Sequence, residues 1–197
     1  MKISFLLSVL LMPLTILSQD CIDIDKQRVS RLQEDIFKLA GDEMEGREPG
    51  TNGEIKARDY LINRMREIGL NPKGTDGFIQ AFTYFEKANQ NEVAVQAHNV
   101  IGFIDNSANK TVVITAHYDH LGKHDTLLFN GADDNGSGTA AVMEIAEAFM
   151  LAKKEGKGPR RSILIMPVSG EEKGLLGSKH YTDNPVYPLE KTVANLN

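Results

Sequence analysis

The sequence predicts an α/β fold, a three-layer α/β/α sandwich with a mixed, mostly parallel central sheet. One observation is a set of nearly continuous apolar runs, at residues 99–104, 110–116 and 161–168. Strands with this composition are typically buried on both faces of a sheet. The second observation is that helical patterns alternate with these runs, which favours helices packed on both faces of the sheet.

Four helices are predicted along the chain. Apolar residues recur with a loose helical period over residues 22–40, and Gly41 ends the pattern. Residues 54–68 carry an apolar stripe, and Gly69 follows at the position of a helix C-cap. The turn formers at residues 46–53 indicate a loop between these helices. Two more helices are expected, at residues 138–153 and 171–181.

Composition places limits on the class of protein. A chain of 197 residues is long enough for one domain with a real core. Two short strands are expected at residues 78–85 and 92–95, joined by a polar stretch, and no internal repeat divides the chain. The net charge of -5 gives no reason to expect nucleic-acid binding, which usually needs a basic face.

Residues 1–18 are predicted to be a secretory signal peptide. Lys2 supplies a short positive region, the apolar run at residues 3–16 is too short for a comfortable membrane span, and Ser18 is a small residue near a plausible cleavage point. We expect export to the periplasm or the medium, with no stable membrane insertion after cleavage. An uncleaved anchor and lipidation at Cys21 are the alternatives. Because Cys21 is the only cysteine, no internal disulfide is possible.

His117 and Asp119 follow the apolar run at residues 110–116. An open α/β sheet places its chemistry at the carboxyl ends of its strands, and imidazoles and carboxylates are zinc ligands. If a turn brings the two side chains together, Asp119 can accept the proton on the other ring nitrogen of His117 and fix its tautomer. A solvated histidine in a loop is the alternative interpretation.

Two further acidic pairs follow apolar runs in the same way. Asp133 and Asp134 lie in the glycine-rich stretch 131–138, where the backbone can approach an ion closely and a carboxylate could bridge two cations. Helix capping explains one polar residue there, but not two adjacent acids. Glu171 and Glu172 could divide two roles, metal binding and proton transfer, although the helix dipole alone also favours acids at this position.

The remaining histidines are interpreted as structural. His120 and His124 stand near His117, but the loop that contains Gly122 is not expected to be helical, so they are predicted to be polar loop residues. No further signal accompanies the other two histidines of the chain.

Taken together, these clusters resemble a known family. The blocks His117-Tyr118-Asp119, residues 131–138 (GADDNGSG) and residues 169–178 (SGEEKGLLGS) are similar to the signature blocks of the co-catalytic zinc aminopeptidases of metallopeptidase family twenty-eight. Upstream, residues 44–51 (MEGREPGT) resemble the loop that opens many members. The similarity runs from about residue 42 to the last residue, and three blocks in the right order make it specific.

The resemblance implies a zinc-dependent exopeptidase of the aminopeptidase type, which hydrolyses N-terminal residues from peptides with a metal-activated water and uses two zinc ions. His117 would bind one zinc, with Asp119 orienting its ring. Asp134 would bridge both ions, Glu172 would bind the other, and Glu171 would be the general base.

The family also uses an Asp on a later strand and a His nearer the C-terminus. Residues 191–197 resemble the start of that strand, but the sequence ends before such an Asp. The expectation is therefore that residues 19–197 are the N-terminal part of a zinc peptidase domain, an incomplete fragment with weak metal affinity and little activity. The alternatives are a single-zinc, glutaminyl-cyclase-like enzyme and a non-catalytic binding domain on the same fold.

Overall fold

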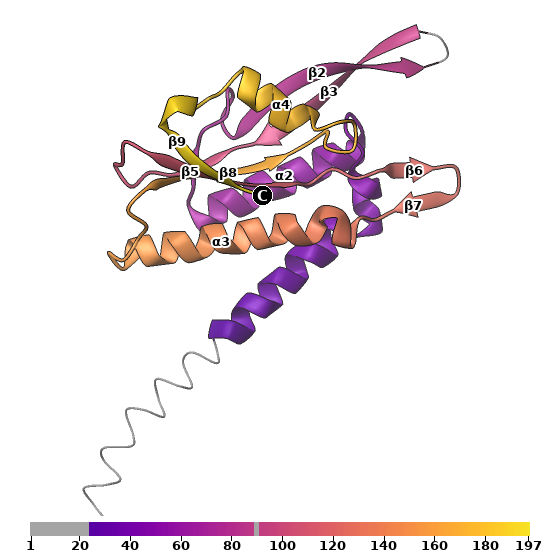
Figure 1. Cartoon of the computed structure of the whole chain (residues 1–197). Coiled ribbons are helices and arrows are strands. Elements are labelled where there is room, and N and C mark those ends of the chain that lie inside the picture. The colour runs from indigo at the N-terminus through magenta and orange to yellow at the C-terminus, as the bar shows by residue number, and fades with distance from the viewer. Residues whose placement is uncertain (1–23, 89–90) are drawn as a thin grey trace, which may run out of the picture.

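A mixed five-stranded sheet forms the centre of the molecule. The computed structural model describes residues 24–88 and 91–197 (Figure 1). The strands of the sheet, in spatial order, are β1 (Asn71–Pro72), β4 (Gly102–Ile104), β8 (Ser162–Val168), β5 (Thr111–His117) and β9 (Thr192–Leu196). The pairs β1–β4 and β4–β8 are antiparallel, whereas β8–β5 and β5–β9 are parallel. The predicted mixed sheet is confirmed, and its parallel part is β8, β5 and β9.

Two hairpins extend from the body of the molecule. The longer pairs β2 (Ile79–Ala88) with β3 (Asn91–Val100), and the shorter pairs β6 (Gly122–His124) with β7 (Leu127–Phe129) (Figure 1). The prediction of one strand over residues 99–104 is wrong, because the chain passes from β3 to β4 at Ile101. Ile101 is fully buried like its neighbours, so hydropathy carries no sign of this change of sheet.

The helices lie close to their predicted positions, with one exception. A helix covers residues 24–39 of the described chain, followed by η1 (Asp42–Arg47), α2 (Asn52–Ile68), η2 (Ala132–Gly136), α3 (Ser137–Lys154), α4 (Leu176–Asp183) and η3 (Leu189–Lys191). Gly69 caps α2 in the left-handed conformation with φ 90°, as expected. The helix predicted at residues 171–181 begins only at Leu176, because Gly174 and Leu175 both adopt positive φ, at 104° and 60°.

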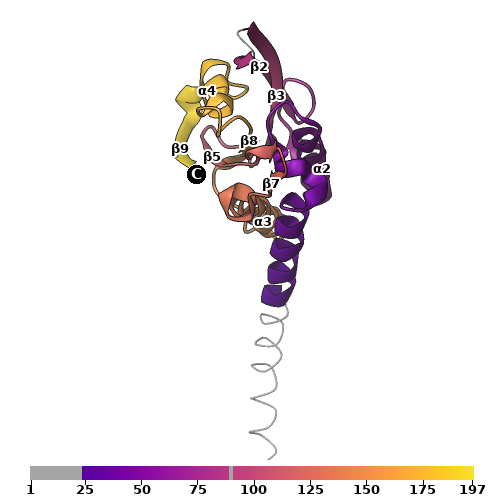
Figure 2. The same cartoon turned by 90° about the vertical axis from the view of Figure 1, so that its right-hand side faces the viewer.

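Helices cover both faces of the sheet. Figures 1 and 2 show α2 and α3 on one face and α4 on the other. Ile163 and Ile165 of β8 belong to the larger core beneath α2 and α3, whereas Leu164 between them belongs to the core beneath α4. Successive side chains of a strand point to opposite faces, so a strand covered on both sides is apolar throughout.

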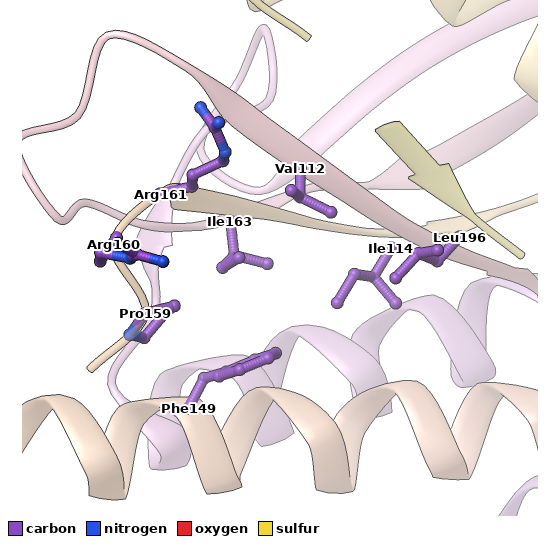
Figure 3. A pocket seen from close by; sticks show the side chains of 8 residues that line it. All are labelled: Val112, Ile114, Phe149, Pro159, Arg160, Arg161, Ile163 and Leu196. Atoms are coloured by element: carbon purple, nitrogen blue, oxygen red, sulfur yellow. The ribbon is translucent and has the colours of Figure 1, made fainter. Parts of the chain in front are cut away.

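One part of the α3-covered face is open. A hollow of about 660 Å³ lies between the strands β5, β8 and β9 and the helix α3 (Figure 3). It is lined by Val112, Ile114, Phe149, Pro159, Arg160, Arg161, Ile163 and Leu196. Among the described strands, β9 pairs with β5 alone, and its residue Leu196 is 56% exposed.

The described residues include no helix that is long and apolar enough to cross a membrane. The signal peptide predicted over residues 1–18, and Cys21 with it, lie outside the described residues.

Candidate metal centre

The parallel pair β5–β8 brings two of the sequence clusters to one edge of the sheet. His117, the last residue of β5, is in register with Val168, the last residue of β8. The amide of Tyr118 donates to the carbonyl of Val168 over 2.9 Å, so the segments that follow β5 and β8 leave the sheet side by side. Glu171 and Glu172 follow in the turn after β8, outside any helix. The helix dipole is therefore not what favours acids at this position.

The third cluster reaches the same edge by another route. It follows β7, which belongs to the separate β6–β7 hairpin, so the apolar run before it is not a strand of the central sheet. The turn is closed by the amide of Gly136, which donates to the carbonyl of Gly131 over 3.0 Å. This places Oδ1 of Asp134 3.1 Å from Nε2 of His117. The neighbouring Asp133 is exposed, and no contact ties its carboxylate to these groups in the described chain.

His120 also lies in the site, although the sequence pattern indicated a polar loop residue. Its Nδ1 is 2.7 Å from Oε1 of Glu172 and 4.0 Å from Oδ2 of Asp134. The side chain is buried, in contrast to His124, whose ring packs edge-on against Phe129 in the hairpin. A spacing of three residues indicates a shared face only on a helix, so the sequence alone held no usable signal for His120.

Asp119 is fully buried behind the site and holds its turn in place. Its two carboxylate oxygens accept the amide hydrogens of Glu171 and Glu172 over 3.2 and 3.3 Å. Nδ1 of His117 lies 3.2 Å from the main-chain oxygen of Asp119 and 3.7 Å from its carboxylate. Both the main-chain oxygen and the carboxylate of Asp119 therefore lie near Nδ1 of His117, and the carboxylate also fixes the Glu171–Glu172 turn.

The acids around His117 set its protonation. Burial lowers the pKa of His117. The hydrogen bonds and charge of Asp119, together with the charge of Glu171, outweigh this effect, so the pKa is raised overall. Oε2 of Glu171 lies 4.0 Å from Nε2 of His117. Both residues line a cavity of about 510 Å³ between the sheet and α4. A reactant in this cavity would lie beside both groups.

A buried cluster of polar groups from α2 and β3 holds the segment that follows β5 in place. The hydroxyl of Tyr118 donates to Oε1 of Glu54 over 2.8 Å and lies 2.7 Å from the carbonyl of His98. Glu54 is fully buried and also accepts the amide of His98 over 3.0 Å. Burial, with the nearby Glu54, raises the pKa of Tyr118 well above its ordinary value, so the hydroxyl stays protonated. These contacts join α2 and β3 to the strand end that carries His117.

The donor set fits zinc. One ligand atom from each of His120, Asp134 and Glu172 lies within 4.8 Å of the others. One imidazole nitrogen and two carboxylate oxygens are ligands that zinc accepts, and three protein ligands are usual in a catalytic site. His117 adds a second imidazole on the other side of Asp134.

Residues 99–197 match the sequence profile of Peptidase family M28, so the chain belongs to this family. A leucine aminopeptidase 1 of Fusarium vanettenii is 43% identical over 133 residues, which are 66% of this chain and 32% of that protein. A probable zinc metalloprotease of Pyrenophora teres is 34% identical over 137 residues, 66% of this chain and 27% of that protein. The chain thus spans between about a quarter and a third of the length of these two relatives.

Solved structures confirm the fold. A glutaminyl cyclase of Porphyromonas gingivalis superimposes with a TM-score of 0.65 at 24% identity, over 84% of this chain and 58% of that one. A zinc aminopeptidase of Bacillus subtilis gives a TM-score of 0.63 at 18% identity, over 85% and 68%. At these identities the likeness establishes the three-layer architecture alone.

Proposed function

We propose that the protein is a zinc-dependent exopeptidase of the aminopeptidase type, and that this chain carries the zinc-binding edge of its sheet. The observation that carries the proposal is the convergence of two imidazoles and three carboxylates, from three separate segments, at the ends of β5 and β8. A leucine aminopeptidase and zinc metalloproteases among the relatives support the substrate class, peptides with a free N-terminus.

Asp134 is the proposed shared ligand of two zinc ions. Its two carboxylate oxygens face different imidazoles, His117 on one side and His120 on the other. Glu172 would join His120 and Asp134 around one ion, and His117 would join Asp134 around the other. His120 would thus supply a third protein ligand, beyond the ligands expected from the sequence.

Glu171 is the proposed general base. Zinc, when bound, would supply the Lewis acidity that polarises a peptide carbonyl and lowers the pKa of water. The carboxylate of Glu171 is 36% exposed and faces the cavity beside His117. Because its backbone is held by Asp119, the carboxylate is free to take a proton from the attacking water and pass it to the leaving amine. Asp119 and Tyr118 keep the turn and the strand end in place.

The zinc-binding step is tested by isothermal titration calorimetry of the chain and two matched variants. Loss of a residue that hydrogen-bonds to a metal ligand typically lowers metal affinity roughly 10- to 100-fold. Asp134→Asn should lower zinc affinity by more than this, because it removes the carboxylate that both ions share. Asp133→Asn, a change of the same kind at the neighbouring exposed acid, should leave the affinity unchanged. Equal effects of the two substitutions would show that Asp134 is not a ligand.

A single-zinc enzyme of the glutaminyl-cyclase kind is the second candidate. The observation that favours it is that His120, Asp134 and Glu172 alone form a three-ligand set for one ion. Zinc stoichiometry separates the two proposals, since the peptidase requires two ions per chain and the cyclase requires one. The cyclase would also convert an N-terminal glutamine to pyroglutamate, whereas the peptidase would release the residue.

We also propose that the protein is exported, on the support of the charged, apolar and small residues in the order found over residues 1–18. N-terminal sequencing of the protein recovered from its native cells tests this. A start near residue 19 agrees with export and cleavage of a signal peptide, and an intact Met1 contradicts that cleavage.

A further inference from the structure

Arg47 is among the largest fully buried side chains in the described part of the protein. A charge removed from water is costly unless it is paired or fully hydrogen-bonded. In the described chain, the four side-chain hydrogen bonds of Arg47 all go to main-chain carbonyl groups. A guanidinium bonded in this way holds several backbone segments at fixed positions relative to one another.

The first segment is the one that carries Asp119. Nε of Arg47 donates to the carbonyl of Tyr118 over 2.6 Å, and the main-chain oxygen of Arg47 accepts the amide of His120 over 3.3 Å. Arg47 therefore contacts the backbone on both sides of Asp119. Asp119 in turn holds the amides of the Glu171–Glu172 turn.

The second segment is the one that leads to Asp134. Nη1 of Arg47 donates to the carbonyl of Asn130 over 2.7 Å, and Nη2 donates to the carbonyl of Gly131 over 2.8 Å. The Gly131 carbonyl also accepts the amide of Gly136, which closes the turn that presents Asp134. A further bond, from Nη1 to Leu39, anchors the guanidinium to the end of the first described helix.

The local backbone is built to turn Arg47 inward. Glu45, Gly46 and Arg47 all lie in the left-handed region, with φ of 52°, 69° and 53°. A Cβ at Gly46 would lie 2.5 Å from the carbonyl oxygen of Phe129 and 2.6 Å from that of Gly122, so the turn is pressed against the β6–β7 hairpin. Non-glycine residues keep such conformations only where the surroundings fix them.

We propose that Arg47 is a positioning residue of the metal centre, which sets the spacing between the Tyr118–His120 segment and the turn that carries Asp134. The inference rests on the proposed zinc-binding function. Burial lowers the pKa of Arg47 to about 10, against the charges of Asp119 and Asp134, so the guanidinium stays charged at neutral pH. Its charge also offsets the nearby carboxylates while zinc is absent.

Arg47→Lys tests the geometry with the charge retained. A lysine carries one nitrogen on a flexible stem and cannot span four carbonyls as a planar guanidinium does. Zinc affinity, measured by calorimetry on the 197-residue chain, should fall about 10- to 100-fold, as is typical when a group behind the ligands is lost. Arg64→Lys is the matched control, because Arg64 bonds Asp35 and Glu147 away from the site and should leave zinc affinity unchanged.

Amide hydrogen exchange of the zinc-free chain gives a second readout that does not depend on the metal. In Arg47→Lys, residues 118–120 and 130–136 should lose protection, whereas Arg64→Lys should leave them unaffected. If the unsubstituted chain binds no zinc, the proposed function fails, and this exchange pattern still decides the role of Arg47. Arg47→Gln, which buries no charge and carries the same expectations, replaces Arg47→Lys if the lysine variant does not fold.

The proposal is overturned if these two segments exchange as slowly in the folded Arg47 variant as in the unsubstituted chain. It is also overturned if the Arg47 and Arg64 variants lose zinc affinity equally, because that result indicates a general loss of stability.

Discussion

The edge of the sheet that carries Asp134 and Glu171 is built differently from the face that α2 covers. At the edge, the side chain of Asp134 is 62% exposed. The loops that carry these acids are held by buried polar groups: Asp119 accepts the amides of the Glu171–Glu172 turn, and Arg47 donates to the carbonyl groups of the turn before Asp134. On the inner face of α2, Leu61 and Met65 are fully buried in the larger hydrophobic core. Apolar burial dominates folding free energy, whereas exposed carboxylates contribute little to it. The residues proposed to bind metal are therefore separate from those that contribute most of the folding free energy.

The largest expected effect is on catalysis at the edge. In the complete enzyme, Glu171→Gln should lower the rate of aminoacyl-anilide hydrolysis by roughly 10²- to 10⁴-fold, because it removes the proposed general base. Zinc affinity and the unfolding free energy should not change, since Glu172 and Asp134 remain. Steady-state kinetics, calorimetry and urea unfolding of one preparation check all three. Undiminished hydrolysis would assign the base to another group.

A substitution in the core is expected to lower stability without changing zinc affinity. Leu61→Ala removes a fully buried side chain from the inner face of α2 and should lower the free energy of unfolding by about 2–5 kcal/mol. The folded fraction should bind zinc as tightly as the unsubstituted chain. Denaturant unfolding measures the first quantity, and calorimetry below the unfolding transition measures the second. A loss of zinc affinity in the folded variant would break the separation.

Tyr118 lies where the two regions meet, so its substitution sharpens the comparison. Tyr118→Phe removes the hydroxyl bonded to Glu54 and should cost about 1–3 kcal/mol, because it leaves a buried carboxylate short of a donor. Tyr187→Phe, on the α4 side of the sheet, is the control and should cost much less. Thermal unfolding of both variants gives the comparison. Similar costs would mean that the Glu54 cluster does not stabilise the strand end.

The smallest effect is expected at the hollow of Figure 3. Leu196 lines it and is 56% exposed, so Leu196→Ala should change the free energy of unfolding by no more than about 0.5 kcal/mol. Denaturant unfolding beside Leu61→Ala measures the contrast. A cost similar to that of Leu61 would show that this margin belongs to the core.

Periodicity predicted the long elements because their patterns are local. The apolar stripe of α2 and its cap at Gly69 lie within one segment, and both were predicted correctly. The break at Ile101 and the late start of α4 were missed because each depends on contacts or dihedral angles that hydropathy does not record. A strand was also expected over residues 191–197, and β9 lies there.

The candidate site divides in a similar way. Clusters of acids and histidine after apolar runs indicated Asp134, Glu171 and His117, which the fold places together. His120 and Arg47 gave no such signal. The place of His120 depends on the conformation of its loop, and the contacts of Arg47 are with carbonyl groups of residues far from it in the sequence. Non-local geometry of this kind is set by the packed structure and not by residue spacing.

The most direct test of the zinc site is a crystal structure of the zinc-soaked protein, with diffraction recorded on both sides of the zinc absorption edge. The account predicts an anomalous peak about 2.0–2.2 Å from a carboxylate oxygen of Asp134, one of Glu172 and an imidazole nitrogen of His120. It predicts a second peak at a similar distance from the other carboxylate oxygen of Asp134 and an imidazole nitrogen of His117. Zinc bound only elsewhere, for instance at His124 or His180, would contradict it.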